Sequence, residues 1–331
     1  MADATRQINL SQIASREGFV HPLRRMKPLM NLRHACLAAL ALLGAAIAPT
    51  ASAQTAAPAR PAALPARPVP ALWKVADEDT TIYLFGTVHA LPRGLDWLNG
   101  PIAAALAQSG ELVTEIPDPD PAEQAAALRR VGLLEGETLR SLMTEEDRAA
   151  FEALLTRLKL RPDAFDRFEP WLAGMSIGMM PYAMAGYGPD DGAESVLRKA
   201  ALAQGKTLGA LETLDYQLSL FDTLPRDKQL VLLRDAVREF DGSVAVIDQM
   251  MREWAQGDPE GLAHLVNDAM DDPQVVDVLL YQRNHAWAAW VRQRLARPGA
   301  VFVAVGAGHL AGPDSVQAAL KAQGIAAVRV Q

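Results

Sequence analysis

Two segments that lie far apart in this sequence end in the same way, and this pairing constrains the fold more than any other feature. The apolar residues 82–85 run into Gly86 and then His89, and the apolar residues 301–305 run into Gly306 and then His309. Apolar runs of this length are typical of buried strands. A glycine after each strand lets the backbone turn out of the sheet and approach a ligand closely. The sequence therefore predicts that both histidines contribute to one composite site.

The order of the other patterned segments predicts an α/β fold. Apolar runs that are nearly continuous indicate strands covered on both faces of a sheet. We expect strands at residues 72–75, 81–85, 111–116, 207–212, 301–305 and 326–330. We expect helices at residues 95–109, 194–204, 216–220, 227–239, 243–256, 259–269, 275–295 and 314–322. Together they predict a mixed, largely parallel central sheet flanked by helices.

Residues 121–190 lose this strand character. Helical patterns at residues 122–130, 145–158 and 170–184 are separated by proline and glycine, which predicts a helical insertion within a domain of residues 72–330. Four methionines with helical spacing occur in the last of these helices: Met175, Met179, Met180 and Met184. We expect them to fill the core, and the alternative is an adaptable surface for a ligand.

The first 53 residues have the pattern of a signal peptide. Arg33 precedes an apolar stretch at residues 35–48, and the small residues around Ala53 predict cleavage after that residue. The stretch is too short for a membrane-spanning helix, so we expect no stable membrane insertion after cleavage. Residues 1–25 are an expected N-terminal extension if the chain starts at Met26 or Met30. The alanine- and proline-rich residues 54–71 predict an extended linker, and the folded protein is expected to be periplasmic or secreted.

Composition restricts the chemistry and the partners. Cys36 is the only cysteine and lies in the expected signal peptide, which excludes disulfides and thiolate metal sites from the mature protein. The net charge of −7 becomes −11 once the six basic and two acidic residues before residue 54 are removed. An acidic protein of this kind is not expected to bind nucleic acid. We expect a peptide or small-molecule substrate, and the sequence leaves the oligomeric state open.

Polar side chains follow four of the predicted strands: His89, Glu115, Glu212 and His309. The carboxyl ends of parallel strands meet at one edge of a sheet, where open α/β folds bind their ligands. Two imidazoles and two carboxylates there suit a divalent metal ion such as zinc, manganese or cobalt. A carboxylate that is not a ligand could act as general base for a metal-bound water.

Each of these residues also has a structural interpretation. A single histidine at the end of a strand commonly caps or packs, although its duplication favours a functional role. Glu115 could be a solvated loop residue because it precedes Pro117, and Glu212 could cap a helix that begins near Thr213. The sequence leaves these alternatives open.

Several short motifs, in this order, resemble the TraB/GumN family. They are Trp73-Lys74-Val75, the run from Ile82 to His89, Glu115, the run from Gly205 to Thr213 with Gln217, Arg283-Asn284, and the run from Phe302 to Leu310. The resemblance covers residues 72–330. It implies a fold related to the Tiki metalloproteases and to haem-binding proteins of the ChaN type.

The resemblance also implies roles for individual residues. His89 and His309 would be metal ligands, with Glu115 and Glu212 as ligands or as the catalytic base. Arg283 would be an electrophilic or orienting group. The remaining residues would support cofactor binding: Asn284, Gly86 and Gly306. Two positions depart from the family pattern, since Gln282 stands where an acidic residue is common and Glu194 where relatives carry aspartate.

The resulting hypothesis is an exported, metal-dependent hydrolase of the peptidase type. The first alternative is a non-enzymatic envelope protein that binds haem or another small ligand, with the methionine-rich helix lining its cavity. The second alternative is an accessory role in exopolysaccharide production, which only the GumN name suggests.

Overall fold

The computed structural model describes residues 64–118, 120–266 and 272–331. The expected signal peptide, the expected start sites and the first ten residues of the expected linker lie outside the described residues. The last residues before the sheet contact a helix, since the Val69 N–H donates to the Ala255 carbonyl oxygen at 2.8 Å.

A six-stranded sheet with the order β6-β4-β7-β2-β1-β8 forms the centre of the domain. Its strands are β1 (Leu72–Ala76), β2 (Thr80–Thr87), β4 (Glu111–Thr114), β6 (Thr207–Ala210), β7 (Gly299–Gly306) and β8 (Val328–Arg329). Strands β6, β4, β7 and β2 are parallel to one another, whereas β1 pairs antiparallel with both β2 and β8. The predicted mixed, largely parallel sheet is confirmed.

The two strands of the duplicated motif are immediate neighbours. Strand β7 lies between β2 and β4, and Thr87 of β2 is paired in register with Gly306 of β7. A Cβ atom added at Gly86 would lie 3.1 Å from the backbone of Ala307, so this glycine allows the two motif loops to pack closely. Both histidines therefore leave the sheet at the same edge.

Helices cover both faces of the sheet. On one face, Val301, Val303 and Val305 pack with Trp287 of α13 (Gln282–Leu295) and Leu320 of α14 (Val316–Ala322). On the other face, the rings of Phe85, Phe302, Trp97 and Trp254 pack together. Helices α2 (Gly100–Gln108) and α7 (Ala193–Ala203) contact this side through β7, β4 and β6. Alternate residues of each strand thus enter different layers, as the two-residue period of a strand requires.

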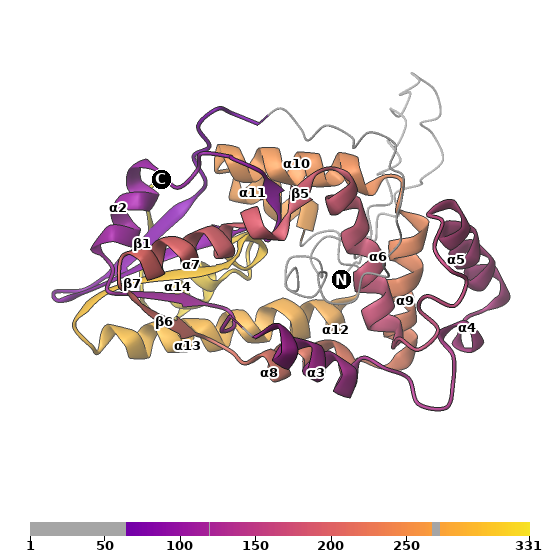
Figure 1. Ribbon diagram of the computed structural model, residues 1–331. Helices are drawn as coiled ribbons and strands as arrows, with labels where there is room; N and C mark the ends of the chain where they lie inside the picture. Colours follow the sequence, from indigo (N-terminus) through magenta and orange to yellow (C-terminus); the bar gives the residue numbers. More distant parts are fainter. Residues whose placement is uncertain (1–63, 119, 267–271) are drawn as a thin grey trace, which may run out of the picture. The chain divides into compact units, whose positions relative to one another are not determined.

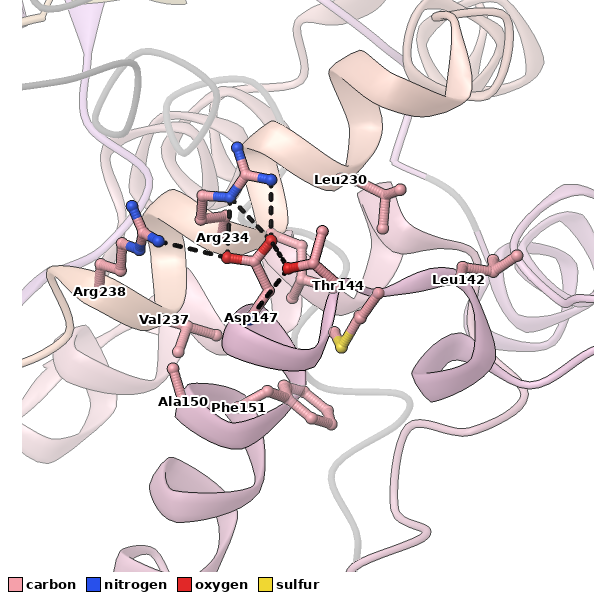
Figure 2. Close-up of a pocket in the computed structure, with 11 residues that line it drawn as sticks. Leu142, Thr144, Asp147, Ala150, Phe151, Leu230, Arg234, Val237 and Arg238 are labelled. Carbon is pink, nitrogen blue, oxygen red and sulfur yellow. Dashed lines mark hydrogen bonds and ion pairs between the residues drawn. The ribbon is translucent and has the colours of Figure 1, made fainter.

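Four helices extend beyond the sheet at the right of Figure 1: α4 (Leu139–Leu142), α5 (Glu145–Arg157), α6 (Pro170–Met184) and α9 (Arg226–Arg238). Helices α3 (Pro121–Val131) and α8 (Leu214–Asp222) lie at the bottom of the picture, and α10 (Ser243–Gln256) and α11 (Pro259–Val266) follow α9 in the chain. Helix α9 packs against both α6 and α5. Figure 2 shows the contact of α5 with α9, where Arg234 and Arg238 bind Asp147.

Other elements differ from the sequence-based expectation in ways that have local causes. The helix expected from residue 95 begins at Gly100, whose φ of +49° and following Pro101 favour a turn and then a helix start. A small sheet of β3 (Leu91–Pro92) and β5 (Tyr187–Gly188) was not predicted, and a 3₁₀ turn, η2 (Pro189–Asp191), follows β5. The strand expected at residues 326–330 is shorter, since β8 covers only Val328–Arg329. None of the described helices is long and apolar enough to cross a membrane.

The helix expected at residues 275–295 is divided. It consists of α12 (Pro273–Val276), a π-helical turn η3 (Asp277–Tyr281) and α13, and Figure 1 shows α12 and α13 running one after the other below the sheet. Turns of π-helix are frequent at functional sites. This one ends two residues before Arg283, and a 3₁₀ turn, η4 (Ala307–Leu310), carries His309 on the facing loop.

Candidate functional site

A buried arginine lies at the centre of the polar residues at the sheet edge. The Arg283 side chain is only 1% exposed. All five of its N–H groups have acceptors. Nε donates to Glu212 Oε1 at 2.9 Å, and Nη2 donates to Glu115 Oε2 at 2.6 Å and to Glu212 Oε2 at 2.9 Å. Nη1 donates to the Leu279 carbonyl oxygen at 3.1 Å and contacts His309 Nε2 at 3.0 Å. No N–H of Arg283 is left for a substrate in this arrangement.

Glu115 follows β4 directly and is buried, so it is not a solvated loop residue. Its Oε1 accepts from the Gly306 N–H at 2.7 Å, and its Oε2 accepts from Gln217 Nε2 at 2.8 Å as well as from Arg283. Burial alone would raise the pKa of this carboxyl, but the Arg283 charge and the Gly306 hydrogen bond oppose it and bring the pKa to about 2. Glu115 is therefore ionised throughout the neutral range.

Side chains from two helices, α8 and α13, donate hydrogen bonds to Glu212. Thr213, not Glu212, caps α8, because the Thr213 hydroxyl accepts from the Tyr216 N–H. The Glu212 carboxylate instead binds Arg283 and accepts from Trp287 Nε1 at 2.9 Å. Gln217 Nε2 donates to Glu212 Oε2 at 3.0 Å and so links the two carboxylates. The Arg283 guanidinium also lies over the Trp287 ring, 4.7 Å from its centroid, which is a cation–π arrangement.

The hydrogen bonds of His309 determine its tautomer. Arginine can only donate, so His309 Nε2 is the acceptor in its contact with Arg283. The proton is then on Nδ1, which donates to Asn284 Oδ1 at 2.7 Å, while Asn284 Nδ2 donates to the Asp314 carbonyl oxygen at 2.8 Å. Burial and the Arg283 charge lower the pKa of His309 to about 3. His309 is thus a neutral, fully bonded member of the network.

His89 has a different environment from its counterpart. Its Nδ1 lies 2.7 Å from Glu194 Oε1, and both side chains are 14% exposed. Its Nε2 is buried and has no hydrogen-bond partner among the described residues. Burial disfavours the charged form, but the Glu194 carboxylate outweighs burial and raises the pKa of His89. A proton on Nδ1 that is held by Glu194 leaves the Nε2 lone pair as an available base.

The loop before α7 places Glu194 against His89. The Ala193 N–H donates to the Val88 carbonyl oxygen at 2.9 Å. A Cβ atom at Gly192 would lie 2.0 Å from the His89 carbonyl oxygen, so only glycine permits this approach. The Thr87 hydroxyl donates to Glu194 as well. Burial tends to raise the pKa of Glu194, but His89 and Thr87 lower it, which keeps the carboxylate charged.

The arrangement does not fit a metal ion bound by all four predicted ligands. Both nitrogens of His309 and both oxygens of Glu212 are already engaged within the network around Arg283. In the described part of the chain, no three histidine, cysteine or acidic side chains lie close enough together to hold a metal. Of the predicted ligands, only His89 has a nitrogen without a partner. Metal binding stays a prediction.

An apolar cavity adjoins His89. It is lined by the end of β2, by Met179 and Tyr182 of α6, by Met250 and Met251 of α10, and by residues of α11 and η4. Burial raises the pKa of Tyr182, so its hydroxyl stays protonated. A second cavity, between α5 and α9, is the one drawn in Figure 2, and the Asp147–Arg234 ion pair lies at its wall.

Sequence reasoning placed most of the site's residues at the sheet edge but missed some of their partners. Gly306 contributes its N–H, and Gly86 accepts from Trp254 Nε1 at 2.8 Å through its carbonyl oxygen. Trp287 was missed, although it follows Arg283 by one helical turn, a spacing that puts both on one face. The pairing of Glu194 with His89 was also missed, because only the folded chain brings α7 to the end of β2.

The model of the TraB/PrgY/gumN family matches residues 71–329. A protein of Escherichia coli (strain K12), named "Uncharacterized protein YbaP", is 28% identical over 185 residues, which cover 56% of this chain and 69% of that protein. An "Uncharacterized protein" of Treponema pallidum (strain Nichols) is 24% identical over 263 residues, covering 74% of this chain and 78% of its own. No solved structure matches.

Proposed function

The chain belongs to the TraB/PrgY/gumN family, and from this premise we propose that it is an exported hydrolase that cleaves an acyl bond, of the peptide type, beside His89. The observation that carries the proposal is the buried, unpartnered Nε2 of His89, whose other ring nitrogen is held by Glu194. A histidine oriented by a carboxylate is a common form of general base.

The proposed reaction needs only water as co-reactant. His89 Nε2 takes a proton from a water molecule while the water oxygen forms a bond to the acyl carbon. The bond between the acyl carbon and the leaving nitrogen then breaks, and that nitrogen receives the proton from His89 Nε2. Glu194 stabilises the imidazolium that exists between the two proton transfers.

The network around Arg283 has a positioning role in this proposal. It ties β4, β7, α8 and α13 together at the sheet edge, and the Glu115 charge also acts on His89 by favouring its protonated form. Because Arg283 has no free N–H, the electrophilic role that the family resemblance implies would require it to leave Glu115 or Glu212.

Turnover of a fluorogenic peptide library tests the proposal. We expect the His89→Gln variant to lose about 10²–10⁴-fold in kcat/KM, the usual contribution of a general base. Glu194→Gln removes only the orienting charge, and we expect a loss of about 10–100-fold. His285→Gln, on the exposed side of α13, is the control and should keep full activity. A His89→Gln variant as active as the wild type would overturn the assignment of the base.

The metal-dependent form of the hydrolase, which the family resemblance implies, is tested separately. Activity lost to a chelator and restored by zinc, manganese or cobalt would support it, together with about one metal ion per chain. Activity that persists in chelator, in a protein without bound metal, would support catalysis by His89 and Glu194 alone.

A second candidate function is the binding of haem or another small apolar ligand. A free imidazole nitrogen and methionine thioethers line the cavity beside His89, which supports a small ligand; haem would require this cavity, about 30 Å³ in volume, to widen. Haem addition that produces a Soret band, lost in His89→Gln, would support this function. The role in exopolysaccharide production stays a prediction from the family name.

A further inference from the structure

The cavity beside His89 is built from parts of the chain that are distant in sequence. The loop after β2 supplies His89, α6 supplies Met179 and Tyr182, and α10 supplies Met250 and Met251. Residues of η4, the turn that carries His309, complete the lining. The cavity therefore adjoins the proposed base and is held by the same loops that hold the two histidine motifs.

The lining of this cavity has a clear chemical character. No aspartate, glutamate, lysine or arginine is among its described lining residues. The hydroxyl of Thr87, another lining residue, already donates to Glu194. Placing a charged group in such a space would cost several kcal/mol of desolvation without a partner, on the order of the penalty for a buried ion. The cavity thus favours an uncharged, apolar occupant.

Three thioethers give the cavity an adaptable shape. Met179, Met250 and Met251 come from two helices, and methionine side chains adjust to irregular apolar groups because they are unbranched and polarisable. Met250 and Met251 are buried, whereas Met179 is half-buried. Met179 is therefore the lining methionine whose size can be changed with the least disturbance of the core.

We infer that this cavity is the specificity pocket of the enzyme, and that it takes an uncharged, apolar side chain next to the bond that is cleaved. The inference rests on the proposed function, because it uses His89 as the reacting base. It adds a substrate class: peptides or acylated amines with a flexible apolar residue, such as methionine, leucine or phenylalanine, on the acyl side of the scissile bond.

The test uses N-acetyl amino-acid p-nitroanilides that carry alanine, methionine, leucine, phenylalanine, aspartate or lysine. Release of nitroaniline gives kcat/KM for the full protein, and calorimetry with the His89→Gln variant gives binding without turnover. We expect the apolar compounds to exceed alanine, aspartate and lysine by about 10–200-fold in kcat/KM, the range for filling an apolar pocket. Equal rates or equal binding for the charged and the apolar compounds would overturn the inference.

Variants of Met179 link the preference to the pocket. Met179→Phe should reduce the preference for phenylalanine relative to alanine by about tenfold, and Met179→Ala should increase it. Met180 is the matched control, since it is the next residue of α6, is also half-buried, and does not line the cavity. If Met179→Phe and Met180→Phe have the same substrate profile, the pocket is not where we place it.

The two proposals can fail independently. No turnover of any compound, combined with apolar binding that depends on Met179, would reject the hydrolase and keep the apolar pocket. Turnover that depends on His89 but shows no effect of Met179 would keep the hydrolase and reject the pocket. Neither turnover nor selective binding would reject both.

Discussion

At the residue scale, Arg283 is the side chain on which most of the buried polar groups depend. Replacing it with methionine would leave Glu115 and Glu212 buried without their shared cation, and breaking a buried pair costs about 3–5 kcal/mol. We expect Arg283→Met to lower the free energy of unfolding in urea by that amount. Arg283→Lys keeps the charge but not the five-donor fork, so it should rescue only part of the loss. Arg292→Met, at an exposed position of the same helix, should change stability by less than about 0.5 kcal/mol.

Two other residues give the protein a predictable response to acid. The pKa of Glu115 is about 2, below its ordinary 4.5, so the stability from this carboxylate is full above pH 4.5 and is lost as the pH falls toward 2. The pKa of His309 is about 3, below its ordinary 6.5, so the unfolded chain binds a proton first and stability falls between pH 6.5 and 3. In urea unfolding between pH 6.5 and 5, where Glu115 does not titrate, His309→Gln should flatten the decline. An unchanged slope would mean that His309 is not held neutral.

At the element scale, the contact between α5 and α9 depends on Asp147. Arg234 binds its carboxylate through three hydrogen bonds, and Thr144, the cap of α5, also donates to it (Figure 2). Hydrogen bonds from Arg234 outweigh partial burial and lower the pKa of Asp147. Asp147→Asn should reduce the free energy of unfolding by about 1–3 kcal/mol, because a charged hydrogen-bond partner is lost. Glu146→Gln removes only the exposed ion pair with Arg238, so it should reduce the free energy of unfolding by less than about 1 kcal/mol.

The elements also show how far sequence patterns can predict this structure. Strands β2 and β7 and their histidine-bearing ends were predictable, because apolar runs and glycine act locally. The π-helical turn before Arg283 and the late start of α2 at Gly100 were not, since both depend on backbone geometry that an apolar pattern does not record. The family resemblance, and not a local pattern, implied that Arg283 belongs to the site. The N–H groups of Arg283 are engaged by Glu115, Glu212 and His309, which come from different parts of the chain. No local sequence pattern encodes that these parts come together.

At the scale of the whole molecule, the first and the last strand of the described domain pair with each other at one side of the sheet. Strand β8 pairs with β1, and the Val330 N–H donates to the Leu72 carbonyl oxygen at 2.8 Å. We expect a variant that lacks residues 326–331 to keep the four parallel strands but to unfold at a lower temperature, since β1 loses its outer partner. Circular dichroism during heating measures this. An unchanged midpoint would show that β8 contributes nothing to stability.

The position of β7 has a consequence for how the protein is made. This strand lies between β2 and β4, yet it comes after both of them and after nearly all of the helices in the chain. Strands β2 and β4 have no common neighbour until β7 has been synthesised, and pairing between strands so far apart in sequence is slow. The duplicated histidine motif can therefore assemble only when the C-terminal part of the chain is available for pairing. A chain that ends before residue 299 would lack the strand that joins β2 to β4, and with it the second histidine of the duplicated motif.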